Sequence, residues 1–195
     1  MLERPRLVIA TGNHHKIQEM TEVLGQWFVV EGLPKNYDAP EETGHDFLSN
    51  ARIKSETASQ RLNTMALADD SGICVDALDG APGIYSARFA GRHGDDEANN
   101  DKVLEEMRKV SDLDRSCRFR CVLALVGQGL EETFAGSCEG VLLPVRRGSG
   151  GFGYDPLFLP NESEATFAEI SLDEKAKISH RARALTKLID WLESH

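Results

Sequence analysis

Two absences from the sequence narrow the class of protein: it has no long hydrophobic run and only four cysteines. No stretch approaches the roughly 18 consecutive apolar residues of a membrane-spanning helix. The N-terminal segment MLERPRLVIATG lacks the longer apolar core and the small-residue cleavage site of a secretory signal. Cys117 and Cys121 are not spaced like the paired CxxC turns of a zinc site. We therefore expect buried free thiols in a cytoplasmic protein without a membrane partner.

Basic residues are also scarce relative to acidic ones. The chain has 22 Lys and Arg against 32 Asp and Glu, which gives a formal net charge of −10. A nucleic-acid polymer is bound through a basic surface, so such a polymer is not expected as the main partner. A small anionic ligand remains compatible, because a few cations, helix amino ends and a bound divalent metal create a locally positive site.

Alternating strand-like and helical stretches predict an α/β fold. The chain shows no repeat or linker, and its length suits one domain that buries about 70% of the surface of the unfolded chain. The expected strands are 7–10, 27–33, 65–68, 73–78, 119–127 and 132–145, with the last two antiparallel. The expected helices are 13–25, 46–62, 95–110 and 179–191, after a short helical turn with a Ser171–Glu174 capping box.

The first expected strand ends in the turn TGNHHK, residues 11–16. A strand that leads through a glycine turn into a helix presents backbone N–H groups and the positive end of the helix dipole to an anion. Lys16, one turn into the helix, is placed to contact the same anion. The turn matches neither GxxxxGK[ST] nor GxGxxG. It is therefore a candidate phosphate site, with an ordinary capped helix as the alternative.

A second candidate is ADDSG, residues 68–72. Two adjacent carboxylates at the end of an apolar strand cost free energy unless they are neutralised, and Mg²⁺ is a common neutralising ion. A plain turn is the alternative, because Asp, Ser and Gly favour turns. Glu41 and Glu42 offer further carboxylates in a loop. Asp95 and Asp96 are explained more simply as the start of a helix.

A third candidate is GSGGFGYDP, residues 148–156, which has four glycines among its first six residues. Glycines break regular structure and allow the backbone to approach a ligand closely. Phe152 within this segment suits stacking against a nucleobase. The alternative is a hydrophobic plug under a flexible turn.

A fourth candidate is ISHRARAL, residues 178–185. Ser179 is a suitable helix N-cap, which places His180 and Arg181 in the first helical turn. Cations there oppose the helix dipole, so an acidic neighbour or an electron-rich ligand is expected beside them. Lys175 on the preceding turn adds a third basic group, although a purely structural role is the alternative. The four candidates together describe a nucleotide with Mg²⁺.

The motifs TGNxxK, ETG, ADDSG, GAPGIYSAR, GGFGYDP and SHR, in this order, resemble the inosine triphosphate pyrophosphatase family over residues 7–190. The resemblance implies an α/β fold with a central mixed β-sheet flanked by helices and two lobes around an active-site cleft. It implies one nucleoside triphosphate pyrophosphatase domain over 1–195, which forms a homodimer. It also implies Mg²⁺-dependent hydrolysis of dITP, ITP and XTP to the monophosphate and pyrophosphate, which keeps deaminated purines out of DNA and RNA.

The resemblance also implies roles for individual residues. Asp70 is expected to act as general base and, with Glu42, to bind the metal. The expected triphosphate contacts are Thr11, Gly12, Asn13, His14, His15, Lys16 and Lys54. The other expected substrate contacts are Ser71 and, around the base, Phe152, Gly153, Tyr154, Asp155, Lys175, His180 and Arg181.

The segment HDFLSNA departs from the TFxENA pattern of many relatives. Asp46 and Ser49 stand there in place of a hydroxyl and a carboxylate, so a third carboxylate at the metal is not established. His14 and His15 are bulkier than the residues that many relatives carry in the phosphate loop.

The chemistry of the base agrees with the implied substrates. A 6-oxopurine presents an acceptor at O6, so an Arg181 donor aimed there would stay unpaired beside adenine, which gives strong rejection. Two other functions stay open: a phosphatase that releases orthophosphate, and a nucleotide-binding sensor without turnover. The intact Asp69–Asp70–Ser71 and Lys54 argue against a sensor, because binding alone needs no base beside the metal. Adjacent aspartates without a DxD pattern argue against an aspartyl-phosphate mechanism.

Overall fold

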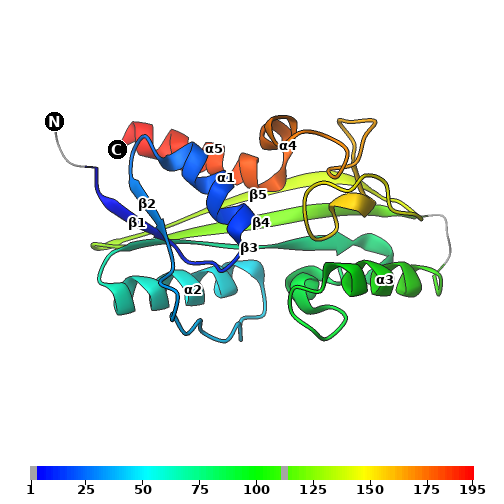
Figure 1. Ribbon diagram of the computed structural model, residues 1–195, viewed down its shortest axis with the longest axis horizontal. Coiled ribbons are helices and arrows are strands. Elements are labelled where there is room, and N and C mark those ends of the chain that lie inside the picture. The colour runs from blue at the N-terminus through cyan, green and yellow to red at the C-terminus, as the bar shows by residue number, and fades with distance from the viewer. Residues whose placement is uncertain (1–3, 111–113) are drawn as a thin grey trace. The chain divides into compact units, whose positions relative to one another are not determined.

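The computed structural model describes residues 4–110 and 114–195 (Figure 1). The chain divides into two compact units. The first unit comprises Met1–Asp70, Val122–Ala135 and Ala184–His195. The second unit comprises Ser71–Cys121 and Gly136–Arg183. A single domain over 1–195 and two lobes around a cleft stay predictions.

The strands form one six-stranded sheet in the order β2-β1-β3-β4-β5-β6. Their bounds are β1 Arg6–Ile9, β2 Val29–Gly32, β3 Met65–Val75, β4 Ser116–Gly127, β5 Leu130–Leu142 and β6 Phe158–Pro160. Strand β1 is parallel to β2 and to β3, whereas β5 and β6 are antiparallel. The sheet is therefore mixed, as expected, and the α/β fold is confirmed.

The helices are close to their expected positions. The α-helices are α1 His14–Leu24, α2 Phe47–Leu62, α3 Asp96–Met107, α4 Leu172–Ile178 and α5 His180–Ser194. The 3-10 helices are η1 Asp76–Leu78, η2 Gly83–Arg88 and η3 Asp155–Leu157. Among the described residues, no helix has the length and apolar character needed to cross a membrane.

In the first unit, helices cover both faces of the strands (Figure 1). Helix α2 lies on one face and α1 on the other. Small side chains allow close packing of α2 on the sheet, because Ala58 shares a buried cluster with Ala10, Ala66 and Ala68. This packing brings the polar side chains of α2 near the carboxyl ends of β1 and of the first part of β3.

The second unit has an aromatic core. The rings of Phe119 and Phe158 are 4.8 Å apart in an edge-to-face contact, and those of Phe158 and Phe167 are 5.0 Å apart. Such contacts add to the free energy of burial. Helix α3 packs through Val103 and Met107 into the same cluster. The four cysteines are buried and free, as expected.

A tight hairpin joins β4 and β5. Gln128 and Gly129 form the two-residue connection and have φ angles of 55° and 82°. Positive φ at both positions is typical of a type I′ turn, whose twist matches that of antiparallel strands. The expected pairing of these strands is therefore correct.

Strand β3 corrects the expectation of two short strands separated by a turn at ADDSG. It runs without interruption from Met65 to Val75. Glycine makes this possible, since a Cβ at Gly72 would lie 2.3 Å from the Gly83 carbonyl oxygen. The Ile73 N–H also donates to Ser86 Oγ at 3.0 Å. These long-range contacts keep turn-forming residues in an extended conformation.

Candidate active site

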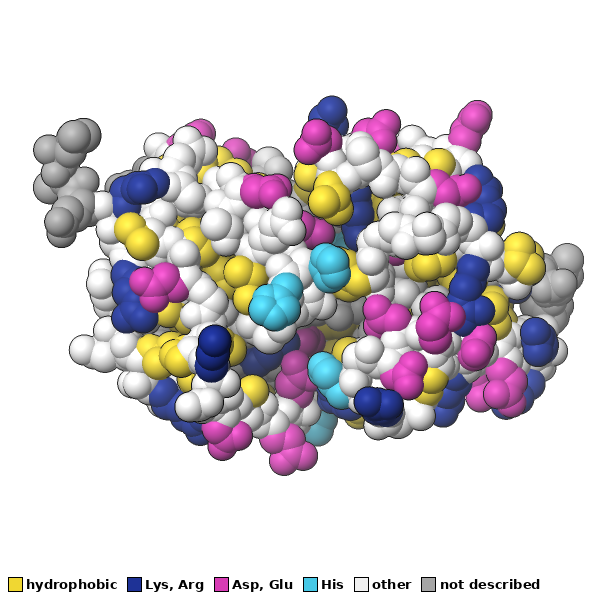
Figure 2. Space-filling view, in the orientation of Figure 1, with side chains coloured by type: hydrophobic (Ala, Val, Ile, Leu, Met, Phe, Trp, Pro, Cys, Tyr) yellow, Lys and Arg dark blue, Asp and Glu magenta, His cyan; other side chains and the backbone are white. Residues whose placement is uncertain are grey.

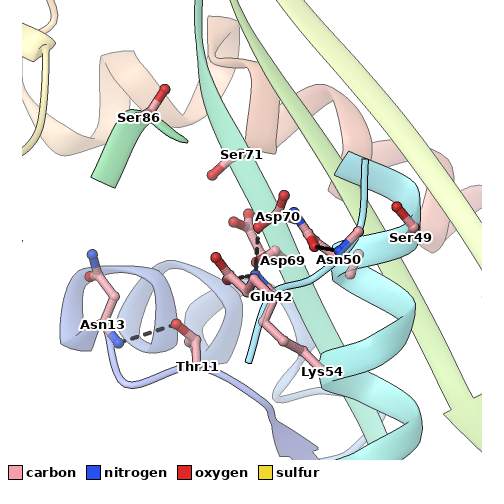
Figure 3. A network of polar contacts seen from close by, with 12 residues as sticks. Thr11, Asn13, Glu42, Ser49, Asn50, Lys54, Asp69, Asp70, Ser71 and Ser86 are labelled. Carbon is pink, nitrogen blue, oxygen red and sulfur yellow. Dashed lines mark hydrogen bonds and ion pairs between the residues drawn. The ribbon is translucent and has the colours of Figure 1, made fainter. Parts of the chain in front are cut away.

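The TGNHHK turn is held by its own polar side chains. The Asn13 Oδ1 accepts hydrogen bonds from the backbone N–H groups of His15 at 2.9 Å and Lys16 at 3.2 Å. The Asn13 N–H in turn donates to Thr11 Oγ1 at 3.2 Å (Figure 3). His14 and His15 are exposed, and a Cβ at Gly12 would meet nothing within 4 Å. The turn therefore offers a preformed, accessible helix start.

Lys16 turns back from α1 toward the end of β3, where it forms an ion pair with Asp69. The Asp69 side chain is fully buried, and that of Lys16 is 14% exposed. Asp69 belongs to the ADDSG candidate, but the family resemblance assigns it no role of its own. The available signal was its position beside Asp70 at the end of a buried strand, because a buried carboxylate requires a charged partner.

Lys54 joins the two expected metal ligands. Its Nζ donates to Glu42 Oε1 at 2.9 Å, to Asp70 Oδ1 at 2.6 Å and to the Asp69 carbonyl oxygen at 2.9 Å (Figure 3). Burial raises the pKa of Asp70 above its ordinary value, against the opposing effect of Lys54. Burial lowers the pKa of Lys54, but the two carboxylates outweigh that effect and raise it. The structure thus brings together a carboxylate pair and a cation.

This carboxylate pair fits Mg²⁺ that binds together with a substrate. The Asp70 Oδ2 is buried and has no hydrogen-bond partner among the described residues. No group of three or more His, Cys, Asp or Glu side chains in the described part of the chain is arranged to hold a metal. Mg²⁺ is commonly bound by one or two carboxylates plus substrate phosphates. Glu42 and Asp70 are suitable ligands on that basis.

Asp46 and Ser49, which differ from the pattern of many relatives, stabilise the start of α2. Asp46 caps α2 and accepts the Ser49 N–H at 2.7 Å, while Ser49 Oγ accepts the Asp46 N–H at 3.2 Å. This reciprocal capping box satisfies two N–H groups at the start of the helix.

Asn50 is a residue near this site that the sequence did not single out. Its side chain is fully buried, and its Oδ1 accepts the Gly44 N–H at 2.8 Å. A Cβ at Gly44 would lie 2.6 Å from that oxygen, so the ETG segment requires glycine there. Asn50 thereby anchors the loop that carries Glu42 to α2 (Figure 3).

In the second unit, cations gather around one aromatic ring. The Lys175 Nζ lies 4.8 Å and the Arg181 Cζ 5.8 Å from the centroid of the Phe152 ring. Lys175 also forms a buried ion pair with Asp155, whose Oδ2 accepts the Phe152 N–H at 2.9 Å. Burial raises the pKa of Asp155, and the Lys175 ammonium opposes that shift. This arrangement supplies the acidic neighbour that the sequence led us to expect beside the cations.

His180 and Arg181 are buried at the start of α5. The His180 ring stacks on Phe119 with centroids 4.7 Å apart and an interplanar angle of 11°. The Arg181 Nη2 donates to Ser71 Oγ at 3.2 Å. Ser179 Oγ accepts the Ala182 N–H at 3.1 Å, which confirms the expected cap. The structure thus brings Ser71 and Arg181 together, although they are far apart in sequence.

Tyr154 is placed differently from the other residues expected around the base. Its hydroxyl donates to the Ser86 carbonyl oxygen at 2.9 Å, and the residue belongs to the aromatic core. Burial raises its pKa strongly. The hydroxyl is therefore used within the fold, and a direct contact between Tyr154 and substrate stays a prediction.

Among the described residues, the surface shown in Figure 2 has no separate acidic or basic patch. Acidic and basic side chains are intermixed over the face shown in Figure 2. The three lysines of the candidate site, Lys16, Lys54 and Lys175, are in contrast paired with buried or half-buried carboxylates.

Comparisons with known proteins agree on one family. Residues 7–191 match the Ham1 family. A protein of Oceanobacillus iheyensis named dITP/XTP pyrophosphatase is 45% identical over 195 residues, covering 97% of this chain and 98% of its own. A protein of Geobacter sulfurreducens with the same name is 48% identical over 191 residues, covering 96% of each chain.

Solved structures lead to the same family. The Ham1 protein of Staphylococcus aureus matches with a TM-score of 0.87 and 39% identity over 97% of this chain and 98% of its own. A HAM1 protein from Coxiella burnetii matches with a TM-score of 0.88 and 38% identity over 98% of this chain and 100% of its own. The family resemblance inferred from the motifs is therefore confirmed.

Proposed function

This chain belongs to the Ham1 family, and from that membership we propose that it hydrolyses nucleoside triphosphates, specifically dITP, ITP and XTP. The products are the nucleoside monophosphate and pyrophosphate. The names of the relatives support this reaction. The observation that carries it is the contact of one ammonium, Lys54, with the carboxylates of both Glu42 and Asp70. Cleavage of a phosphoanhydride requires such an arrangement of cation, metal ligands and base.

The first unit acts on the triphosphate. Lys16 and Lys54 form ion pairs with carboxylates, and phosphate oxygens are equivalent anionic partners for both. The Asn13 cap occupies the N–H groups of His15 and Lys16, so side-chain cations contribute more to phosphate binding than these amides.

Asp70 accepts the proton of the attacking water. Its raised pKa improves its strength as a base, and its unpartnered Oδ2 is the acceptor that can take the proton. Glu42 and Asp70 would hold Mg²⁺, which supplies neutralisation of the charge that develops on the phosphate oxygens. Lys54 supplies a further cation to the same oxygens.

The second unit recognises the base. The flat Phe152 ring provides a stacking surface, and the buried Lys175 and Arg181 side chains carry only donors. Beside a 6-oxopurine, a donor meets the O6 acceptor, whereas beside adenine it stays unpaired in a dry pocket. Asp70, the expected general base, and Ser71, which accepts a hydrogen bond from Arg181, are consecutive residues of β3.

We also propose an assembly, a cellular location and a biological role for this activity. We expect a homodimer in the cytoplasm with one pyrophosphatase domain over 1–195. It acts on free nucleotides and not on a nucleic-acid polymer. Its role is to keep deaminated purines out of DNA and RNA.

A product assay tests the reaction. The protein is incubated with Mg²⁺ and dITP, XTP, dATP or dGTP, and pyrophosphate is measured separately from orthophosphate. We expect pyrophosphate from dITP and XTP and little from dATP, which lacks the O6 acceptor. Little is also expected from dGTP, although guanine carries the same O6 and has to be refused at its 2-amino group. Release of orthophosphate would support a phosphatase, and nucleotide binding without either product would support a sensor.

A further inference from the structure

The backbone of Gly153, which follows the candidate stacking ring of Phe152, is held by side chains of another element, helix α3. The Gly153 N–H donates to Asp96 Oδ2 at 2.6 Å, and the Gly153 carbonyl oxygen accepts from Asn100 Nδ2 at 2.8 Å. Asp96 and Asn100 lie one turn apart on α3 and face the same direction. Two side chains of the first turns of α3 therefore hold both polar groups of one glycine.

The segment around Phe152 depends on such external contacts. Gly148, Gly151 and Gly153 have positive φ angles of 79°, 71° and 61°. Glycine loses the most conformational entropy on ordering, so a glycine-rich loop needs partners to stay in one conformation. The Phe152 N–H has such a partner in Asp155. Asp96 supplies the partner for the next N–H, so both amides that flank the Phe152 side chain are held by carboxylates.

Asp96 and Asn100 are also hydrogen-bonded to each other within α3. The Asn100 Nδ2 also donates to the Asp96 carbonyl oxygen at 2.7 Å, and Asn100 is 1% exposed. The capping of α3 is performed by the preceding residue, since Asp95 Oδ1 accepts the Ala98 N–H at 3.2 Å. The expectation that Asp95 and Asp96 start a helix is therefore confirmed, and the Asp96 carboxylate has a further role because it accepts the Gly153 N–H.

We propose that Asp96 and Asn100 are positioning residues for recognition of the purine. They hold the loop so that the Phe152 ring stays beside Lys175 and Arg181, ready to stack on the base. This inference rests on the proposed function of the site. Because neither residue touches the phosphates, their loss weakens binding and selectivity while the rate of the chemical step is kept.

The test compares three substitutions at neighbouring positions. Asp96→Ala removes the acceptor of the Gly153 N–H, Asp96→Asn keeps an oxygen acceptor there, and Asp95→Ala removes only the cap of α3. We expect Asp96→Ala to raise KM for dITP about tenfold, as for the loss of one hydrogen bond to a charged group. We also expect it to lower the dITP-to-dATP ratio of kcat/KM, with kcat close to that of the wild type.

The other two variants separate positioning from helix stability. Asp96→Asn is expected to restore KM to within about threefold of the wild-type value. Asp95→Ala is expected to lower the melting temperature and leave KM unchanged. An unchanged KM and selectivity in Asp96→Ala, or an equal rise of KM in Asp95→Ala, would overturn the proposal.

Asn100→Leu provides an independent variant if Asp96→Ala does not fold. Leu has the same branched shape as Asn, and the Asn100 Oδ1 has no hydrogen-bond partner among the described residues, so the hydrogen bonds lost are those of Nδ2 to the carbonyl oxygens of Gly153 and Asp96. The variant removes the donor to Gly153 and is expected to raise KM in the same way. Wild-type KM in a folded Asn100→Leu protein would contradict a role for this residue.

Hydrogen exchange of the Gly153 amide, measured without nucleotide, separates this proposal from the proposed function. We expect faster exchange in Asp96→Ala than in the wild type or Asp95→Ala. Unchanged exchange would refute the contact whatever the enzyme does. If exchange rises but the wild-type protein does not release pyrophosphate from dITP, the proposed function fails and the contact stands.

Discussion

The two units hold their cations in different surroundings. In the first unit, the Lys16 and Lys54 side chains are 14% and 15% exposed, and each pairs with carboxylates of the candidate site. In the second unit, the Lys175 side chain is 5% exposed and Arg181 is 1% exposed. Both of the latter lie near the Phe152 ring, and Lys175 also lies near Phe167 of the aromatic core.

Under the proposed function, the difference matches the two ends of a nucleoside triphosphate. A triphosphate carries a high charge that changes as the reaction proceeds, so its cations have to exchange one anionic partner for another. A purine is flat and neutral, and its identity is read from a few donors and acceptors, which discriminate best where water is excluded. Partly exposed ion pairs suit the first task, and buried cations beside a ring suit the second.

The largest expected effect is on catalysis in the first unit. Asp70→Asn removes the proton acceptor and is expected to lower kcat for dITP about 10³-fold, which is within the range for general bases. Binding of a non-hydrolysable α,β-methylene analogue is expected to change little in calorimetry. Asp46→Asn is a control, because Asp46 caps α2 and the carboxamide keeps the acceptor. Loss of binding together with turnover would indicate that Asp70 only holds the metal.

The next largest expected effect is on the free energy of unfolding, which is expected to depend more on an ion pair of the second unit than on one of the first. Asp155→Ala leaves the Lys175 ammonium buried without its carboxylate, which costs about 3–5 kcal/mol in the free energy of unfolding. Glu42→Ala costs about 1 kcal/mol or less, because Lys54 keeps Asp70 and the Asp69 carbonyl oxygen. Denaturant titrations measure both values. Equal losses would show that the two units do not differ in this respect.

The smallest expected effect concerns the thiols, all of which belong to the second unit. Burial raises the pKa of Cys138 to about 11, and a thiol reacts as its thiolate. We expect almost no alkylation by iodoacetamide at pH 8 in the native protein, and complete alkylation in denaturant. Asp155→Ala is expected to speed native-state alkylation, whereas Glu42→Ala is not. Rapid labelling of the wild-type protein would show that this core opens readily.

Local features of the structure could be predicted from the sequence because neighbouring residues determine them. Asn13 and Ser171 cap their helices as expected, and the Asp46–Ser49 pair starts α2. The order of strands and helices follows from apolar periodicity. Each candidate motif can be recognised because it combines residue types that neither a hydrophobic core nor a surface loop requires.

The remaining features depend on residues far apart in the chain. The continuity of β3 through Gly72 results from its contact with the segment at Gly83 and Ser86. The partners of Asp69 and Asp96 lie 53 and 57 residues away in sequence. The sequence can show that a carboxylate is buried and needs a partner, but it does not show which residue that partner is. Tertiary structure alone therefore assigns Asp96 to the Phe152 loop.

The division of labour between the units is tested most directly by the ratio of kcat/KM for dITP to that for dATP in Lys16→Met and Arg181→Met. Both changes replace a long cation by an apolar side chain of similar reach. We expect Lys16→Met to lower kcat/KM for both nucleotides in parallel and leave the ratio unchanged. Arg181→Met is expected to lower the value for dITP and reduce the ratio toward one. A ratio altered by Lys16→Met and unaffected by Arg181→Met would contradict the account.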